Sequence, residues 1–208
     1  MPYNRFEQLD EKKRLNVLET ALDEFTKNSF KSSSINQISK KAGLSAGALY
    51  YYFEDKEDLF YSTLDYAVKR LWNHVGDTKT LFEEYGYWEG ITEIVLKRLE
   101  LSKTHPKYMK LFYRVLLSED EVEFEGRNRF LEPFYEIFEY GYTGGYIRDD
   151  LPKDLLFDMH FNMTITVNKW TLKGQFDNSK EALDSWDLRE LSIKTVDMIR
   201  LAMSKEEQ

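Results

Sequence analysis

Cysteine is absent from this chain of 208 residues, and histidine occurs only three times, at positions far apart in the sequence. Without cysteine the protein has no disulfide framework, no thiolate metal site and no cysteine nucleophile. The sequence also lacks a glycine-rich phosphate loop and an H-E-x-x-H motif. We therefore predict no catalytic residues, no metal site and no cofactor, and we expect a protein that is not an enzyme.

Long apolar runs are missing as well. No segment reaches the length of about 18 apolar residues that a membrane-spanning helix needs. The first residues, MPYNRFEQLDEKKRL, contain no apolar core of the kind found in a signal peptide. We therefore expect a cytoplasmic protein that does not associate with a membrane.

Proline and glycine are sparse, with four and ten residues, and apolar residues recur mostly at helical spacing. We find no internal repeat and no strand pattern, so we predict an all-α fold. The expected helices cover residues 9–28, 35–42, 46–53, 56–75, 78–85, 88–104, 106–118, 122–144, 153–174 and 187–204. The residues that share one face of the first helix are Leu15, Leu18, Leu22 and Phe25. Pro133 lies inside an apolar helical pattern, which predicts a kink or a break there.

The net charge of −8 argues against a nucleic-acid partner, but the charges are unevenly distributed. Residues 1–56 carry nine Lys or Arg and eight Asp or Glu, a net charge of +1, whereas residues 57–208 carry −9. Residues 25–53 contain four lysines and no acidic residue. A phosphate-facing surface needs such an acid-free basic patch. A solvated loop region that lacks acids by chance has the same composition, so both interpretations remain open.

Two short helices are predicted around the stretch AGLSAGALYYYF, residues 42–53. Ser34 and Gln37 have the S-x-x-Q spacing of a capping box and so begin the first helix. Gly43 can end this helix in the left-handed conformation, and Ser45 is the N-cap candidate of the second helix. This arrangement is a helix-turn-helix, which places its second helix in the major groove of DNA.

The second short helix has two dissimilar faces. Leu49 and Phe53 lie four residues apart, and we expect them to pack on the first two helices. Because each residue advances a helix by about 100°, the opposite face points away from this core. The residues of this outward face are Gly47, Ala48, Tyr50 and Tyr51. Small residues at the start of the helix allow another surface to approach closely, and the tyrosine hydroxyls can reach a polar partner.

The segment IxxISKKAGLSAGALYYYFEDKEDLF, which begins at Ile35, resembles the DNA-binding domain of the TetR family of transcriptional regulators. The resemblance covers about residues 10–65, and beyond them only the helical pattern and the length agree. It implies a homodimer with a three-helix DNA-binding head and a larger helical body, whose last two helices form the dimer interface. Most members repress transcription until a small-molecule inducer binds in the body.

Two residues depart from the family pattern. Ser29 stands where the family often has glycine, so we expect Asn28 to adopt the left-handed conformation instead. Ser39 stands where alanine is usual, and its hydroxyl can form a hydrogen bond back along the helix. Neither departure changes the predicted motif.

The resemblance also implies a set of DNA contacts. They are Ser34, Asn36, Ser45, Ala46, Gly47, Ala48, Tyr50, Tyr51 and Lys56. Tyr50 and Lys56 match residues that meet phosphate, and Tyr51 matches a variable position that often meets a base. The alternative for Ser34 and Ser45 is a role as helix caps only.

Residues 57–208 contain 24 of the 32 aromatic residues. Aromatic stripes at helical spacing are usual in a core, and ligand pockets are lined in the same way, so both interpretations remain open. The candidate pocket residues are Trp88, Phe112, Tyr113, Phe134, Phe138, Tyr142, His160, Phe161, Thr164 and Asn168. This composition favours a small hydrophobic or aromatic effector.

From the resemblance we expect a helix-turn-helix DNA-binding domain at residues 1–55 and a helical effector-binding and dimerisation domain at residues 56–208. The last two predicted helices suit a four-helix interface around a twofold axis, with packing on the body of a monomer as the alternative. The predicted partners are double-stranded operator DNA, a second copy of the chain and a small-molecule effector. An effector-independent DNA-binding regulator or activator, and a helical enzyme, remain as other functions.

Overall fold

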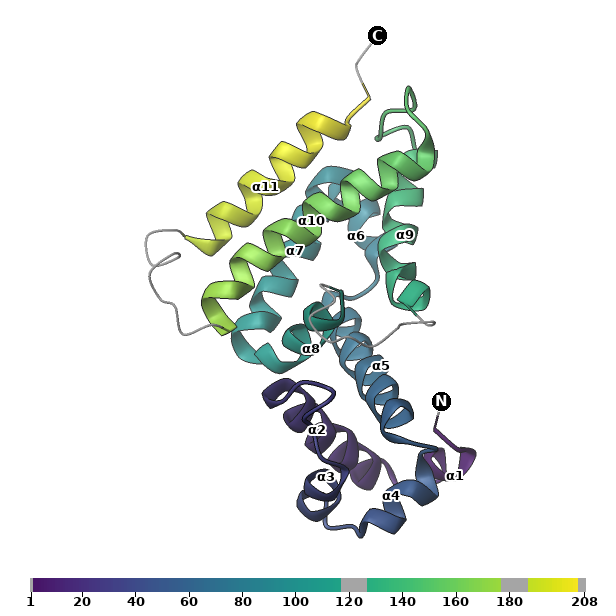
Figure 1. Cartoon of the computed structure of the whole chain (residues 1–208). Coiled ribbons are helices and arrows are strands. Elements are labelled where there is room, and N and C mark those ends of the chain that lie inside the picture. The colour runs from purple at the N-terminus through teal and green to yellow at the C-terminus, as the bar shows by residue number, and fades with distance from the viewer. Residues whose placement is uncertain (1, 117–126, 177–186, 206–208) are drawn as a thin grey trace. The chain divides into compact units, whose positions relative to one another are not determined.

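The computed structural model describes residues 2–116, 127–176 and 187–205, with side chains for all of these except 127–129 and 167–176. The described residues form eleven α-helices and no strand, apart from an isolated antiparallel bridge between Ile147 and Ser204 (Figure 1). The predicted all-α fold is confirmed. Among the same residues, no helix combines the length and the apolarity needed to cross a membrane.

The helices follow the predicted boundaries closely. They are α1 (Asn4–Glu7), α2 (Glu11–Lys27), α3 (Ile35–Lys41), α4 (Ala46–Tyr52), α5 (Lys56–Val75), α6 (Thr78–Tyr85), α7 (Tyr87–Thr104), α8 (Pro106–Leu116), α9 (Arg127–Thr143), α10 (Lys153–Phe176) and α11 (Leu188–Met203). Helices α5 and α6 begin and end at the predicted residues. Helix α1 was not predicted. The predicted helical residues 117–118 and 122–126 lie outside the described residues.

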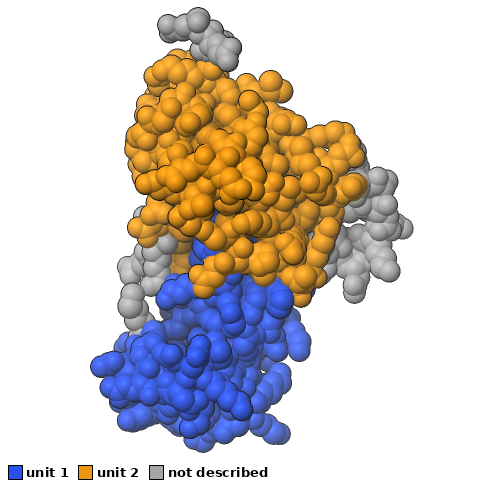
Figure 2. Space-filling view, turned by 180° about the vertical axis from the view of Figure 1, so that it is seen from behind, with its two compact units in different colours: residues 1–72, 105–124 blue, residues 73–104, 125–208 orange. Residues whose placement is uncertain are grey.

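The chain forms two compact units, which Figure 2 shows in different colours. Unit 1 consists of residues 1–72 and 105–124, and unit 2 consists of residues 73–104 and 125–208. These units are defined by packing. The division into a DNA-binding domain at 1–55 and an effector-binding domain at 56–208 is defined by function, and it stays a prediction.

Helix α2 begins where Asp10 accepts a hydrogen bond from the backbone N–H of Lys13 at 3.0 Å. Such a cap satisfies an N–H group that has no partner within the helix. The buried residues of its face towards the core include Val17, Ala21, Leu22 and Phe25. Leu15 and Leu18, at the start of the predicted face, are only half-buried. Helix α2 packs on two neighbours, α3 and α8.

Helix α8 is joined to α2 by polar contacts within unit 1. Lys107 forms ion pairs with Glu19 and, at 3.0 Å, with Asp23. The Tyr108 hydroxyl donates to Glu19 at 2.6 Å, and Arg114 donates to the carbonyl oxygen of Phe25 at 2.8 Å. The burial of Glu19 alone would raise the pKa of its carboxyl, but the hydrogen bonds from Lys107 and the tyrosines outweigh it and lower this pKa.

Unit 2 has a core rich in aromatic rings, centred on Tyr87 of α7. The Tyr87 side chain is 1% exposed, and its ring lies 5.3 Å from that of Phe82 and 5.2 Å from that of Tyr146. Helix α9 comes so close that a Cβ atom at Gly141 would overlap with the Tyr87 ring. Glycine at position 141 therefore allows this contact between α7 and α9.

Of the kink or break predicted at Pro133, the break does not occur, because α9 continues through this residue from Arg127 to Thr143. The kink stays a prediction. A proline inside a helix removes one backbone hydrogen bond, and tertiary packing can offset that loss. Phe130, Phe134 and Phe138 on the same helix are all buried. Their burial holds the helix together on both sides of the proline.

Candidate nucleic-acid interface

Helix α3 begins at Ser34, as the sequence predicts. The Ser34 hydroxyl accepts a hydrogen bond from the N–H of Gln37 at 3.3 Å. The reciprocal half of the predicted capping box was wrong, because the N–H of Ser34 donates to the Glu24 carboxylate instead, at 3.3 Å. The Ser39 hydroxyl donates back to the carbonyl oxygen of Asn36 at 3.1 Å, which confirms that prediction.

The turn after α3 depends on Gly43, which has a φ of 73°. In this left-handed conformation the N–H of Leu44 reaches the carbonyl oxygen of Ser39 at 2.8 Å and closes the end of the helix. Ser45 then begins α4, where its hydroxyl accepts a hydrogen bond from the N–H of Ala48 at 3.1 Å. Both predicted boundaries are confirmed, and the two short helices form the expected helix-turn-helix.

The two faces of α4 are oriented as the helical spacing predicts. Leu49 and the adjoining Phe53 are each 1% exposed. On the other side Gly47 is exposed, and Tyr50 and Tyr51 are 52% and 54% exposed. Small residues and two tyrosines therefore form an exposed surface on one side of α4, while the opposite side is buried.

The other predicted DNA contacts have different environments. Asn36 is exposed on α3, whereas Ala46 and Ala48 are half-buried at the start of α4. Lys56 has a structural role: its ammonium group donates to the carbonyl oxygens of Phe30 and Lys31, at 2.8 and 3.3 Å. It thereby holds the loop between α2 and α3, and its contact with phosphate stays a prediction.

Asn28 does not adopt the left-handed conformation, so that prediction was wrong. Its φ is −116° and its ψ is 153°, which is extended backbone. Its side-chain amide donates to the Glu24 carboxylate at 2.9 Å. Glu24 is buried, and it also pairs with Lys41 at 3.4 Å. The same carboxylate therefore organises the loop from both sides and removes the need for a left-handed residue.

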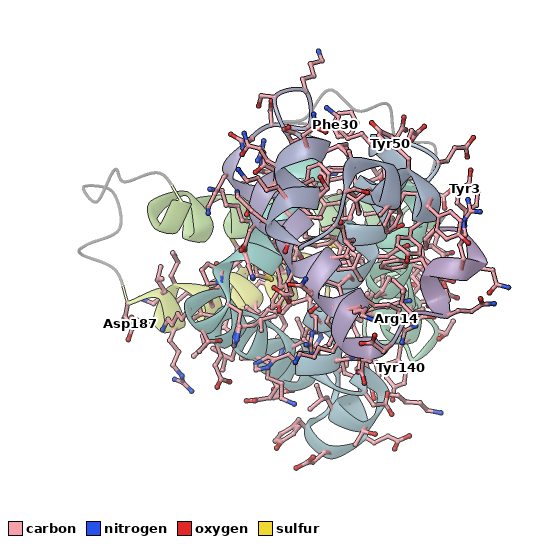
Figure 3. All side chains as sticks on the ribbon, turned by 90° about the horizontal axis from the view of Figure 1, so that it is seen from below. Tyr3, Arg14, Phe30, Tyr50, Tyr140 and Asp187 are labelled. Atoms are coloured by element: carbon pink, nitrogen blue, oxygen red, sulfur yellow. The ribbon has the colours of Figure 1, made fainter. Side chains whose placement is uncertain are left out.

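Helix α1 adds a residue to this surface that the sequence did not reveal. Phe6 is buried, with its ring 4.6 Å from that of Phe53, and this contact fixes α1 against α4. The Arg5 guanidinium then lies 4.1 Å from the centre of the Tyr51 ring and 4.3 Å from that of Tyr3. Tyr3 is labelled in Figure 3 together with Tyr50. A helix of four residues is too short to show a helical pattern in the sequence.

The sequence model of a family described as bacterial regulatory proteins, tetR family, matches residues 17–62, which include the whole helix-turn-helix. The HTH-type transcriptional regulator RutR of Escherichia coli K12 is 30% identical over 106 residues, which are 51% of this chain and 49% of RutR. The HTH-type transcriptional regulator AcrR of Shigella flexneri is 43% identical over 47 residues, 23% of this chain and 22% of AcrR.

The helix-turn-helix part of the chain is thus similar to that of the TetR family of bacterial regulatory proteins. The fold of the chain also resembles that of a TetR family transcription regulator from Marinobacter aquaeolei VT8, with a TM-score of 0.67 at 21% identity. That similarity covers 96% of this chain and 100% of the other, and it concerns the fold alone. In sequence, the chain spans about half the length of its curated relative RutR.

Unit 2 of the chain contains a cavity of about 40 Å³. Of the ten predicted pocket residues, the cavity is lined by Phe134, His160 and Thr164. Trp88, Phe138 and Phe161 are buried elsewhere in unit 2, and Tyr142 is half-buried. Phe112 and Tyr113 are buried in α8, which belongs to unit 1. The side chain of Asn168 lies outside the described residues.

The cavity is also lined by a cationic residue that the sequence did not indicate. Arg98 of α7 is 3% exposed and lines the cavity with His160. Burial lowers the pKa of His160 to about 4, so its imidazole is neutral at pH 7. A helical arginine among charged neighbours gives no sequence signal for burial. The described residues contain no group of three or more His, Asp or Glu placed to hold a metal ion.

Proposed function

We propose that this protein is a dimeric regulator of transcription that binds operator DNA through α4 in the major groove. The observation that carries the proposal is the outward face of α4, where Gly47, Tyr50 and Tyr51 are exposed while Leu49 is buried. A recognition helix needs this division, because it must pack on its own domain and still reach base edges.

In this proposal Tyr50 donates its hydroxyl to a phosphate, and Tyr51 contacts a base. Phosphate contacts position a protein on DNA, and base contacts provide the sequence preference. Ala46 and Ala48 offer only methyl groups, which suit contact with a thymine methyl. With few hydrogen-bonding side chains on α4, the preference depends partly on DNA shape.

A second copy of the chain supplies the other half of the proposed regulator. Helices α10 and α11 contact each other and carry large apolar side chains that are exposed in the single chain. These residues are Leu155, Met159, Met198 and Leu201. Leu201 is 87% exposed, which suits a surface that a twofold partner covers. Such a dimer places its recognition helices about 34–36 Å apart, one turn of DNA.

The proposed regulator is a repressor that leaves its operator when an effector binds in unit 2. The cavity among α7, α9, α10 and α11 supports an effector site, since its lining combines apolar residues with a few polar groups. An effector acts in this way if it binds one of two arrangements of the dimer more tightly. An effector-independent regulator or activator is the alternative, and it uses the same DNA-binding surface.

Fluorescence anisotropy with DNA from upstream of the protein's own gene tests the proposal. We expect saturable binding that weakens with salt, and a smaller preference for this DNA over a shuffled duplex in Tyr51→Ala. Tyr50→Phe is expected to weaken binding to both duplexes by about fivefold, because one hydrogen bond of about 1 kcal/mol is lost. Tyr85→Phe, a change at an exposed tyrosine of α6, is the matched control. Binding that is unchanged in both α4 variants contradicts the proposal.

A further inference from the structure

The cavity in unit 2 has an apolar wall and a polar end. Its aliphatic lining comes from α7, α9 and α11 and consists of Ile91, Ile94, Val95, Ile137, Val196 and Ile199. The polar lining consists of Arg98, His160, Thr164, Ser192 and Thr195. None of the lining residues that the structure describes is acidic. The chemistry of the polar end therefore decides what the cavity can bind.

The three hydroxyl groups at the polar end already use their hydrogen atoms. Thr164 donates to the carbonyl oxygen of His160 at 3.0 Å. Ser192 donates to that of Leu188 at 2.7 Å, and Thr195 donates to that of Leu191 at 2.8 Å. Each hydroxyl is thus bonded within its own helix. The other side-chain N–H groups that line the cavity belong to Arg98 and His160.

His160 is the clearest sign of a missing partner. Its side chain is 6% exposed, and its Nε2 atom is buried with no hydrogen-bond partner among the described residues. A buried polar atom without a partner is unusual and costs free energy. Arg98 lines the same cavity, with its guanidinium carbon 5.4 Å from the centre of the Phe134 ring. Both residues can donate hydrogen bonds to an occupant that only accepts them.

We infer that the cavity binds the carboxylate group of a small aliphatic acid, with Arg98 and the Nε2–H of His160 as donors and the aliphatic wall around the carbon chain. The inference deepens the proposed function, on which it rests, by naming the chemical class of the effector. Arginine suits this role because its planar guanidinium matches the two oxygens of a carboxylate. A neutral histidine suits it because one ring nitrogen carries a hydrogen.

The size of the cavity limits the acid. A volume of about 40 Å³ accommodates about three water molecules, at about 10–15 Å³ for each. Three water molecules occupy about 90 Å³ of liquid, at about 30 Å³ each. This space limits the occupant to a small acid of about four carbon atoms, by that estimate. Butanoate is therefore the probe, and butanamide is its neutral counterpart of nearly the same shape.

Isothermal titration calorimetry on the full chain, without DNA, measures this binding directly. We expect butanoate to bind saturably at one site per chain, and butanamide to bind at least tenfold more weakly. Equal affinity for the two compounds, or no saturable binding of butanoate, overturns the inference. This comparison uses the unchanged protein, so it remains decisive whatever happens to the variants.

Two variants locate the site. Arg98→Gln and His160→Gln are each expected to weaken butanoate binding at least tenfold. Arg200→Gln also removes a positive charge from unit 2, but Arg200 pairs with Glu89 on the surface, so it serves as the control and is expected to keep full affinity. Circular dichroism checks that each variant is folded. Full affinity in a folded Arg98→Gln protein overturns the assignment.

DNA binding is measured separately, so that the two proposals fail in different ways. If the protein binds its upstream DNA but not butanoate, the inference fails and the DNA-binding function stands. If it binds butanoate but no DNA, the proposed regulator fails and the acid site stands. If butanoate binds and also releases the DNA, with butanamide inactive at the same concentration, both are supported.

Discussion

Arg5 illustrates how one residue from outside the helix-turn-helix acts on its surface. The guanidinium lies over the Tyr51 ring at 4.1 Å and so limits the orientations of an otherwise exposed side chain. Such a contact contributes about 0.5–1 kcal/mol at an exposed site. It also brings a positive charge to a face whose own residues on α4 are all uncharged.

We predict that Arg5→Ala weakens binding to the upstream DNA about fivefold, because it frees the Tyr51 ring and removes a positive charge near phosphate. Arg14→Ala is the control. This substitution also removes one positive charge from unit 1, but the Arg14 guanidinium pairs with the Glu7 carboxylate at 2.8 Å. Anisotropy titrations at two salt concentrations provide the measurement. If the two variants lose the same affinity, Arg5 contributes only general charge.

His160 predicts a pH dependence of stability. Its pKa is about 4 in the folded protein and about 6.5 in the unfolded chain, so the unfolded state takes up the proton first as the pH falls. The part of the stability that depends on a neutral His160 is therefore present above about pH 6.5 and is lost as the pH falls. Between pH 7.5 and pH 5 this residue alone is expected to cost about 2 kcal/mol.

Urea unfolding at both pH values checks this expectation in the wild-type protein and in His160→Gln. The variant is expected to lose about 2 kcal/mol less between pH 7.5 and pH 5, because glutamine does not titrate. An identical loss in both proteins means that the other groups account for the whole acid sensitivity.

At the scale of elements, the sequence was most informative where a helix boundary depends on local chemistry. Ser34, Ser45 and Gly43 have the predicted cap and turn roles because each acts on backbone groups within a few residues. At Pro133, where we predict a kink or a break, the helix does not break, and Phe130, Phe134 and Phe138 around it are buried. The cavity was only partly predicted, since Arg98 and Ser192 meet through tertiary structure.

Helices α7 and α9 provide a test of close packing. We predict that Gly141→Ala lowers the free energy of unfolding by about 2 kcal/mol, because the added methyl group overlaps with the buried Tyr87 ring. Gly47→Ala is the matched control: the atom nearest to its new Cβ is the Ser45 hydroxyl, at 3.9 Å. Alanine is the better helix former by about 0.8–1 kcal/mol, so this variant is expected to gain stability. Urea unfolding measures both changes, and a stable Gly141→Ala protein contradicts the close contact.

At the scale of the whole molecule, the proposed function requires two copies of the chain. The exposed apolar residues of α10 and α11 suit a twofold interface, and the two DNA-binding surfaces then act on one duplex. A monomer has one such surface, so it loses the second set of phosphate contacts and the avidity that depends on them.

We predict that the double change Met198→Glu and Leu201→Glu converts the dimer into monomers and weakens DNA binding at least tenfold. Charged side chains in the covered interface leave carboxylates without partners. Leu151→Glu, at an exposed leucine outside α10 and α11, is expected to leave the dimer intact. Analytical ultracentrifugation gives the mass of each protein. A double variant that remains dimeric excludes these residues from the interface.

The absence of cysteine allows the central claim to be tested most directly, because a single introduced thiol is the only one in the chain. An iron chelate that cleaves DNA is attached to Tyr51→Cys on α4 and, as the control, to Tyr85→Cys on α6. With the upstream duplex bound, the probe at position 51 is predicted to cut within two sites about one helical turn apart, and the probe at position 85 to cut nowhere. Bound DNA that the probe at position 51 leaves intact, or cuts no more than the control does, contradicts the placement of α4 in the groove.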